Sequence, residues 1–501
     1  MLKLDWGPML NAYPDSMGGT LSDIVNLLGK ELKGLFDSFY ILPSLFHSDL
    51  DRGFCIIDYD LEESMSTRSD LERIKRLGIS LKLDFVLNHQ SIQSPEFQDI
   101  LKNGQHSRYR DYFIDWNKFW NNHGSFGEDG YIVPESKYLE KMFFRKPGLP
   151  LLMVDFPDGS SVPYWNTFYQ EKTILSDGTV KYSGQIDVNI KSPLVWEAYD
   201  RTLQKLTEYG ASLIRLDAFA YTSKEIGKRN FLNSPETWEI LHDIQKLGKK
   251  NGLSFLPEIH AGYEEHIYDE LADQQYLSYD FFLPGLLIYA MEKHNPRPLK
   301  EWAEEINDKN LKMVNMLGCH DGIPMLDLRG KLPNDEIQEL IDLIVSRGGH
   351  VKNLHGQKDT YYQVNATYFS ALGEEPKKLL FARAVQLFMP EKPQIWYLDL
   401  FAGKNDYDAV TKAGSGGHKE INRTNLTKKM INAAFSEEVV TEQIRLLRLR
   451  NNHSVFSVDS EFKIKQIGNV VIFLWRREGI SLSLEANFDT YEYKIVEGKN
   501  E

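Results

Sequence analysis

Cysteine is scarce in this 501-residue chain, which contains only Cys55 and Cys319. Two cysteines so far apart give neither a metal-binding spacing nor a disulfide framework. Reduced thiols are typical of cytoplasmic proteins, and we predict a cytoplasmic location. The sequence also contains no cluster of cysteine and histidine and no glycine-rich phosphate loop, so we expect no metal and no cofactor.

Long hydrophobic runs and excess positive charge are missing as well. The most apolar segment, 281–291, is too short to span a membrane and contains Pro284-Gly285. The first residues lack the basic start and apolar stretch of a signal peptide. Lysine and arginine total 58 against 72 aspartate and glutamate, so the net charge is −14. This balance argues against nucleic acid and against a membrane surface as partners.

What the chain does contain is a series of strand-like runs with helices between most of them. The runs lie at 9–13, 36–42, 79–87, 211–217, 253–256, 276–282, 313–317 and 394–398. Helix starts are indicated at Thr20, by a capping box at Ser69–Glu72, and at Ser192-Pro193 and Ser234-Pro235. Repeated βα units predict an α/β protein with a parallel sheet, and eight units fit a closed (β/α)₈ (TIM) barrel better than an open sheet.

The remaining segments indicate insertions and an appendage. We predict the first part of the barrel at 1–88, an inserted domain at 89–190 and the continued barrel at 191–320. A second insertion follows at 321–375, then the last part of the barrel at 376–454 and a C-terminal domain at 455–501. Alternating apolar residues near 469–475 and 481–485 predict that this last domain is a short antiparallel β-sheet.

One strand carries two charges that a buried strand would normally exclude. Arg215 and Asp217 interrupt the apolar run that begins at Ala211. Side chains two apart in a strand point the same way, so the guanidinium is expected to lower the pKa of the carboxyl and keep it ionised. An ionised, oriented aspartate at a strand end is a ready nucleophile, although an isolated Arg-x-Asp could also be a structural ion pair.

Polar residues recur at the ends of the other predicted strands. They are Asp84, Asn88, His89, Arg215, Asp217, Glu258, His260, His320 and Asp321. Taken singly, each carboxylate is more often a cap or loop residue, and each histidine a structural one. In a barrel, however, strand ends meet at one face, and three carboxylates there suit glycoside chemistry, which needs an ionised nucleophile and a protonated acid.

Four of these segments resemble the ordered signature regions of the α-amylase superfamily. They are Asp84-Phe-Val-Leu-Asn-His89, Ile214-Arg-Leu-Asp-Ala218, Pro257-Glu-Ile-His260 and Cys319-His-Asp-Gly322. Four further segments are similar to the sucrose phosphorylase group, namely Asp51-Arg-Gly-Phe54, Tyr221-x-x-Lys-Glu-x-Gly227, Gln363-Val-Asn-Ala-Thr-Tyr-Phe-Ser-Ala-Leu-Gly373 and Ile421-Asn-Arg423. The resemblance covers most of the chain and is weakest at 101–180 and in the C-terminal domain.

The resemblance implies a role for each matched residue. Asp217 would be the nucleophile, Glu258 the general acid and base, and Asp321 the transition-state stabiliser. The substrate would be bound by Asp51, Phe54, His89, Phe168, Gln185, Arg215, Tyr221, His260, His320, Tyr362, Gln363 and Arg423. Phosphate would be bound by Arg145, Lys146 and Arg423, and the loop in the 321–375 insertion would bind the acceptor. Without the resemblance, Arg145 and Lys146 would read as a solvated loop pair.

Two departures from the group affect the acceptor region. Lys146 stands where members often carry arginine, and lysine lacks the bidentate fork that suits phosphate. Asp359-Thr-Tyr-Tyr362 replaces the Leu-Asp-x-Tyr of sucrose enzymes. Relatives that use a 6′-phosphate usually carry histidine at the position of Tyr362, so this tyrosine argues against a phosphorylated sugar, whereas Arg145 would suit one.

The function predicted is that of a retaining α-glucoside phosphorylase that converts sucrose and phosphate to α-D-glucose 1-phosphate and fructose. Its partners would be a small sugar and phosphate as co-substrate, and the protein would be a monomer or homodimer. Alternatives are a related phosphorylase acting on sucrose 6′-phosphate, glucosylglycerol or glucosylglycerate, and an α-glucoside hydrolase. A non-catalytic carbohydrate-binding protein is disfavoured because all three carboxylates are present.

Overall fold

The computed structural model describes residues 6–174, 176, 180–353, 361–414 and 417–499. Eight parallel strands form its centre, in the order β14-β13-β5-β2-β1-β20-β16-β15. Their bounds are β1 (Met9–Ala12), β2 (Ser38–Ile41), β5 (Ser80–Val86), β13 (Ala211–Asp217), β14 (Ser254–Pro257), β15 (Ser278–Asp280), β16 (Met313–Asn315) and β20 (Lys392–Trp396). The end strands β14 and β15 contact each other, so the sheet forms a nearly closed barrel. The predicted eight-stranded parallel barrel is confirmed.

Helices surround the strands in the predicted alternation. They include α1 (Leu21–Gly29), α2 (Arg68–Arg76), α6 (Pro193–Glu208), α7 (Glu236–Lys250), α8 (Ile267–Asp273), α9 (Leu283–Glu292), α10 (Arg297–Asp308), α13 (Pro376–Phe388) and α17 (Glu438–Asn452). Several bury one face through apolar residues at helical spacing, as in α6, where Val195, Tyr199, Leu203 and Leu206 are buried, whereas α9 and α13 are buried along most of their residues.

Two local predictions need correction. The capping box of α2 is formed by Thr67 and Asp70, whose side chains each accept a hydrogen bond from the other's backbone N–H, rather than by Ser69 and Glu72. The last barrel strand begins at Lys392, earlier than predicted, and Tyr397 already belongs to the helical turn α14 (Tyr397–Leu400). In both cases the residue pattern identified the element but misplaced its boundary, because neighbouring residues satisfy the same pattern.

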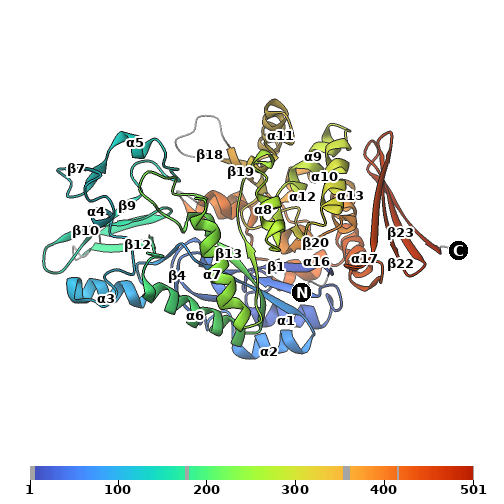
Figure 1. Ribbon diagram of the computed structural model, residues 1–501. Helices are drawn as coiled ribbons and strands as arrows, with labels where there is room; N and C mark the ends of the chain where they lie inside the picture. Colours follow the sequence, from blue (N-terminus) through green and yellow to red (C-terminus); the bar gives the residue numbers. More distant parts are fainter. Residues whose placement is uncertain (1–5, 175, 177–179, 354–360, 415–416, 500–501) are drawn as a thin grey trace.

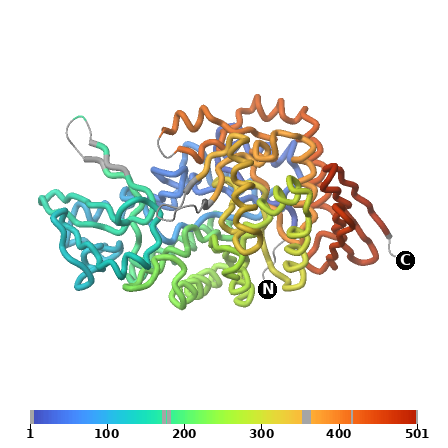
Figure 2. The backbone as a smooth tube through the Cα atoms, turned by 90° about the horizontal axis from the view of Figure 1, so that it is seen from above, coloured from blue at the N-terminus to red at the C-terminus, as the bar shows by residue number. Residues whose placement is uncertain are grey.

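The two ends of the molecule are formed by segments outside the barrel (Figures 1 and 2). At one end, between β5 and α6, lie β6 (His89–Ser91), α3 (Pro95–Asn103), α4 (Trp116–Phe119), β7 (Gly124–Phe126), β8 (Ile132–Pro134), α5 (Ser136–Leu139), β9 (Leu151–Asp155), β10 (Ser161–Trp165), β11 (Gln170–Ile174) and β12 (Val180–Asp187). At the other end an antiparallel sheet comprises β21 (Glu461–Ile467), β22 (Val470–Arg477), β23 (Ile480–Asn487) and β24 (Glu492–Lys499), as predicted.

A third group of elements follows β16. It contains β17 (Ile323–Pro324), the 3₁₀ turn η6 (Leu326–Leu328), α11 (Asn334–Ser346), β18 (His350–Asn353), β19 (Tyr361–Asn365) and α12 (Tyr368–Ala371), with the strands in the order β17-β19-β18. Between β20 and α17 lie α15 (Tyr407–Ala413), the 3₁₀ segment η7 (Gly417–Asn422) and α16 (Lys428–Ala434). The division of the chain into domains at the numbered boundaries stays a prediction.

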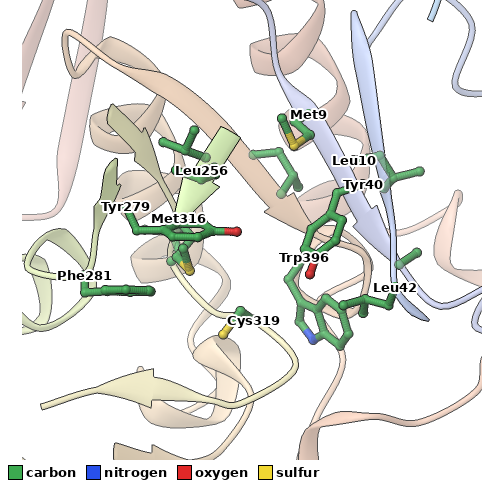
Figure 3. Close-up of a cluster of buried hydrophobic side chains, with 14 of the residues drawn as sticks. Met9, Leu10, Tyr40, Leu42, Leu256, Tyr279, Phe281, Met316, Cys319 and Trp396 are labelled. Carbon is green, nitrogen blue, oxygen red and sulfur yellow. The ribbon is translucent and has the colours of Figure 1, made fainter. Parts of the chain in front are cut away.

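The barrel interior is filled by large side chains. Tyr40, Tyr279 and Trp396 point inward with Met316 and Phe281 around them (Figure 3). Because these side chains fill the interior, the barrel is a packed core and not a pore. A site is therefore expected at the carboxyl ends of the strands.

Candidate functional site

A cavity of about 480 Å³ opens at the carboxyl ends of the barrel strands. The predicted residues that line it are Asp51, Phe54, His89, Arg145, Phe168, Gln185, Asp217, Tyr221, Glu258, His320, Asp321, Gln363 and Arg423. Residues separated by hundreds of positions in sequence therefore meet in one place. The cavity is large enough for a disaccharide-sized ligand.

Strand β13 delivers the central ion-pair group. Arg215 and Asp217 are both buried and point the same way, as alternation in a strand requires. Nη1 of Arg215 lies 2.6 Å from Asp84 Oδ1 and 2.7 Å from Asp217 Oδ1, and its Nη2 lies 2.6 Å from Glu258 Oε1. One guanidinium thus holds three carboxylates, and Arg215 lies behind the cavity wall.

The protonation of this group differs from the sequence expectation. Burial raises the pKa of Asp217 well above its usual range; Arg215 opposes this, and the carboxylates of Glu258 and Asp84 add to it. Burial also acts on Glu258, but Arg215 and His260 together lower the pKa of that carboxyl. The expectation that Arg215 would keep Asp217 ionised ignored this competition. Burial and the neighbouring carboxylates therefore favour the protonated form of Asp217, whereas Arg215 and His260 favour the ionised form of Glu258.

Opposite this group, four charges form a ring in the cavity wall. Arg423 lies 3.5 Å from both Asp51 and Asp321, and Lys419 lies 2.6 Å from Asp321 and 3.9 Å from Asp51. Burial raises the pKa of Asp321, but His320, Lys419 and Arg423 hold it well below its usual range. The charge ring, Asp51, Arg423, Asp321 and Lys419, offers both donors and acceptors to sugar hydroxyls.

Aromatic side chains complete the inner wall. The rings of Phe54 and His320 stack at 4.9 Å, and His89 Nε2 lies 3.0 Å from the Phe54 carbonyl oxygen. The backbone that presents Phe54 turns sharply at Gly53, which has a φ of 111°. A Cβ there would lie 2.1 Å from the Ser44 backbone nitrogen, so only glycine fits this approach.

The outer wall carries a cation against two aromatic rings. The Arg145 guanidinium lies 5.8 Å from the ring centroids of both Phe168 and Tyr221. Tyr169, next to Phe168, lines the same cavity and is 41% exposed. This combination suits a ligand with a sugar face and an anionic group.

Like Arg215, Lys146 and His260 lie outside the cavity wall, and the side chain of Tyr362 is not described. The ammonium of Lys146 contacts Asn166 Oδ1, outside the cavity wall, and burial lowers the pKa of this lysine to about 8. This placement does not support the phosphate-binding role predicted for Lys146. His260 lines a small cavity of about 20 Å³ behind Glu258. Tyr362 belongs to β19, but its side chain, like residues 359 and 360 of the predicted acceptor loop, lies outside the described part of the structure.

Sequence reasoning missed several residues of the cavity wall. They are Leu50, Arg52, Tyr169, Ala218, Ala413, Gly417, His418, Lys419 and Glu420. Four of them, Leu50, Arg52, Tyr169 and Ala218, are direct neighbours of residues that were found. Lys419 and Glu420 immediately precede the Ile421-Asn-Arg423 segment, and that proximity was the available signal.

A lysine occupies an oxygen-lined position between the barrel and the β6–β12 segment. The buried Lys224 ammonium lies 2.6 Å from Asp187 Oδ2, 2.5 Å from Asn88 Oδ1 and 2.5 Å from the Tyr221 carbonyl oxygen. Across the residues that the structure describes, no group of three or more His, Cys, Asp or Glu could hold a metal ion. The same residues include no helix long and apolar enough to cross a membrane.

The barrel and its acidic cavity define a glycoside-processing enzyme of the (β/α)₈ class, and the alpha-amylase catalytic domain family matches residues 15–321. The chain is 48% identical to a sucrose 6(F)-phosphate phosphorylase of Ilumatobacter coccineus, over 97% of this chain and 95% of that protein. It is 30% identical to a sucrose phosphorylase of Streptococcus mutans, over 98% and 97%. The crystal structure of sucrose 6F-phosphate phosphorylase from Thermoanaerobacter thermosaccharolyticum superposes with a TM-score of 0.89 and 32% identity, covering 99% of this chain and 98% of that one.

The chain therefore belongs to the alpha-amylase superfamily and, within it, to the sucrose phosphorylase group of retaining glycoside phosphorylases. Its enzyme type is glycosyl transfer to phosphate by double displacement, as the sequence predicted.

Proposed function

We propose that this enzyme converts sucrose 6′-phosphate and phosphate to α-D-glucose 1-phosphate and fructose 6-phosphate. The observation that carries this choice is the 48% identity to a sucrose 6(F)-phosphate phosphorylase over 97% of the chain. The sequence analysis ranked sucrose first on its resemblance to the sucrose phosphorylase group, and Tyr362, a residue of β19, argued only weakly against a phosphorylated sugar. Identity over the full length weighs more than that one position.

The cavity supports a mechanism in two displacements. The Asp217 carboxylate attacks the anomeric carbon while Glu258 gives its proton to the departing fructosyl oxygen, which leaves a glucosyl ester on Asp217. Phosphate then attacks the same carbon from the opposite face, and the ester electrons return to Asp217. Two inversions retain the α-configuration. The acid step needs a proton on Glu258 and the attack needs Asp217 ionised, so we propose that substrate binding shifts the proton balance between these two carboxyls.

The charge ring supports recognition of a terminal glucosyl unit. Carboxylates of Asp51 and Asp321 can accept hydrogen bonds from sugar hydroxyls, and Arg423 can donate to them. The anionic Asp321 also stabilises the oxocarbenium-like transition state. Lys419 must move from Asp321 when a hydroxyl takes its place.

The outer wall supports an anionic acceptor. With a net charge of −14, the protein has to concentrate cations locally to hold a sugar phosphate or a phosphate dianion. Arg145 lies beside Phe168 and Tyr221, which can pack against the fructosyl ring. No cofactor takes part in this chemistry, and phosphate is a co-substrate.

The deciding experiment runs the reaction in reverse. Phosphate release from α-D-glucose 1-phosphate is measured with fructose 6-phosphate, fructose, glycerol or glycerate as acceptor. We expect fructose 6-phosphate to give the highest kcat/KM, by about tenfold or more over fructose, because a charged hydrogen bond is added. A preference for fructose would overturn the choice of a phosphorylated substrate.

Sucrose itself is the second candidate, favoured by the 30% identity to a sucrose phosphorylase over 98% of the chain. We also propose, as the sequence analysis did, a cytoplasmic location and a monomeric or homodimeric state. Cell fractionation and sedimentation of the purified protein test them.

A further inference from the structure

His260 lies behind the predicted acid and base rather than in the main cavity wall. Its Nε2 is 3.7 Å from Glu258 Oε1, and its ring stacks on Phe281 with centroids 3.9 Å apart. This stacking fixes the plane of the imidazole. His260 therefore contacts Glu258 from outside the wall of the main cavity.

Asp327, in η6, holds His260 from the other side. Its Oδ2 lies 3.1 Å from His260 Nδ1, and its Oδ1 accepts a hydrogen bond from the Ala261 backbone N–H at 3.3 Å. Asp327 is 1% exposed. A buried carboxylate in this position orients the ring and stabilises its charged form.

The two oxygens of Glu258 are in different environments. Oε1 lies 2.6 Å from Arg215 and 3.7 Å from His260, whereas Oε2 accepts a long 3.4 Å hydrogen bond from the Ala218 backbone N–H. Oε1 is thus held by cations, and Oε2 is the oxygen placed to exchange a proton with the ligand.

We propose that Asp327 and His260 are positioning residues that keep Glu258 a weak base in the glucosyl-enzyme, so that phosphate rather than water takes the glucosyl group. This inference rests on the proposed glucosyl transfer to phosphate and not on which sugar leaves.

The two possible second steps differ in what they require of Glu258. When HPO₄²⁻ attacks, one of its anionic oxygens forms the C1–O bond, the C1–O bond to Asp217 breaks, and the products are a glucose 1-phosphate monoanion and the Asp217 carboxylate. When water attacks, the same bonds form and break, but a proton must pass to Glu258. Phosphate needs little help from a base, so a weaker base slows hydrolysis of the glucosyl ester more than it slows phosphorolysis.

The cations act most strongly at this stage of the cycle. Once Asp217 is an ester it carries no charge, so Arg215 is shared only by Glu258 and Asp84. Burial lowers the pKa of His260, but Asp327 and Glu258 together raise it to about 9, which keeps the imidazolium charged at neutral pH. The other titratable groups around the small cavity are Tyr40, Arg215, Tyr279, Cys319, His320 and Asp321.

The test uses α-D-glucosyl fluoride as donor, because fluoride departs without acid help and exposes the second step alone. Glucose and glucose 1-phosphate are measured at several phosphate concentrations and from pH 6 to 10. For Asp327→Asn we expect the ratio of glucose to glucose 1-phosphate at pH 7 to rise about threefold or more, as Brønsted behaviour gives for a base strengthened by about one pKa unit. In the wild type the ratio of glucose to glucose 1-phosphate should rise only as the pH passes about 9, the pKa to which Asp327 and Glu258 raise His260.

His260→Gln provides a second variant with the same expected change, and it keeps a polar side chain of similar size. Asp342→Asn, an exposed position on α11, is the matched control and should leave the ratio unchanged. Thermal melting shows whether each variant is folded. Folded Asp327→Asn and His260→Gln variants with the wild-type ratio across the pH range would overturn the inference. A wild type that makes no glucose 1-phosphate would instead overturn the proposed function.

Discussion

Arg215 Nη1 lies 2.7 Å from Asp217 Oδ1, and both side chains project from the same face of one barrel strand. The contact orients the carboxylate that we propose as nucleophile. Asp217→Asn preserves the shape but cannot attack the anomeric carbon, so we expect turnover to fall at least about a thousandfold. Steady-state kinetics measure the loss, and an unchanged circular dichroism spectrum shows that the fold is intact. Substantial residual turnover would assign the nucleophile elsewhere.

The neighbouring residues Arg145 and Lys146 should behave differently. Arg145 lines the cavity, whereas the ammonium of Lys146 contacts Asn166. We expect Arg145→Ala to lower kcat/KM for phosphate and for fructose 6-phosphate about 30-fold, as loss of a charged contact does, and Lys146→Ala to change either by less than about threefold. Kinetics with each substrate varied separately compare the two. Equal losses of kcat/KM in the two variants would support the original prediction that Lys146 binds phosphate.

Lys419 should affect both substrate use and its pH dependence. It lies 2.6 Å from Asp321, and together with His320 and Arg423 it lowers the pKa of that carboxyl against the effect of burial. Lys419→Met should raise the pKa of Asp321, so the acid limb of the kcat/KM profile should move to higher pH. Lys429→Met, on the exposed face of α16, serves as the control. An unmoved acid limb would show that Lys419 does not set the charge of Asp321.

The buried pair of Lys224 and Asp187 should matter for stability. Lys224→Met leaves the Asp187 carboxylate buried without its cation, which costs about 3–5 kcal/mol. Urea unfolding followed by tryptophan fluorescence measures the change. Adding Asp187→Asn removes the uncompensated charge, so the double variant should recover part of the loss. Additive losses in the double variant would contradict the coupling.

His260 should make stability depend on pH in the alkaline range. Its pKa rises from 6.5 to about 9 on folding, so its contribution is fully present below pH 6.5 and is lost as pH rises through 9. Because Glu258 also contributes to this rise, we expect the difference in unfolding free energy between the wild type and Asp327→Asn to shrink by about 1.4 kcal/mol for each pKa unit that Asp327 supplies. Denaturant titrations at pH 6 and pH 9.5 measure it. A constant difference would show that Asp327 does not stabilise the charged ring.

The residue pattern alone predicted the barrel and five residues of the cavity wall, His89, Asp217, Glu258, His320 and Asp321, whereas the other predicted wall residues came from the family resemblance. Strand alternation placed Arg215 and Asp217 on one face of their strand. The repeated βα units predicted that Glu258 and Asp321 would lie near them, because parallel strands end at one face of a barrel. These inferences depend on local periodicity, which a sequence displays directly.

Only the tertiary structure decided the contacts between loops. Asp327 contacts His260, and Lys419 reaches Asp321, across stretches of chain that no local pattern links. Arg145 and Lys146 are adjacent in sequence, yet only the first lines the cavity, since the path of their loop determines which side chain turns inward. The raised pKa of Asp217 likewise depends on burial and on the carboxylates of Glu258 and Asp84, which come together only when the barrel closes.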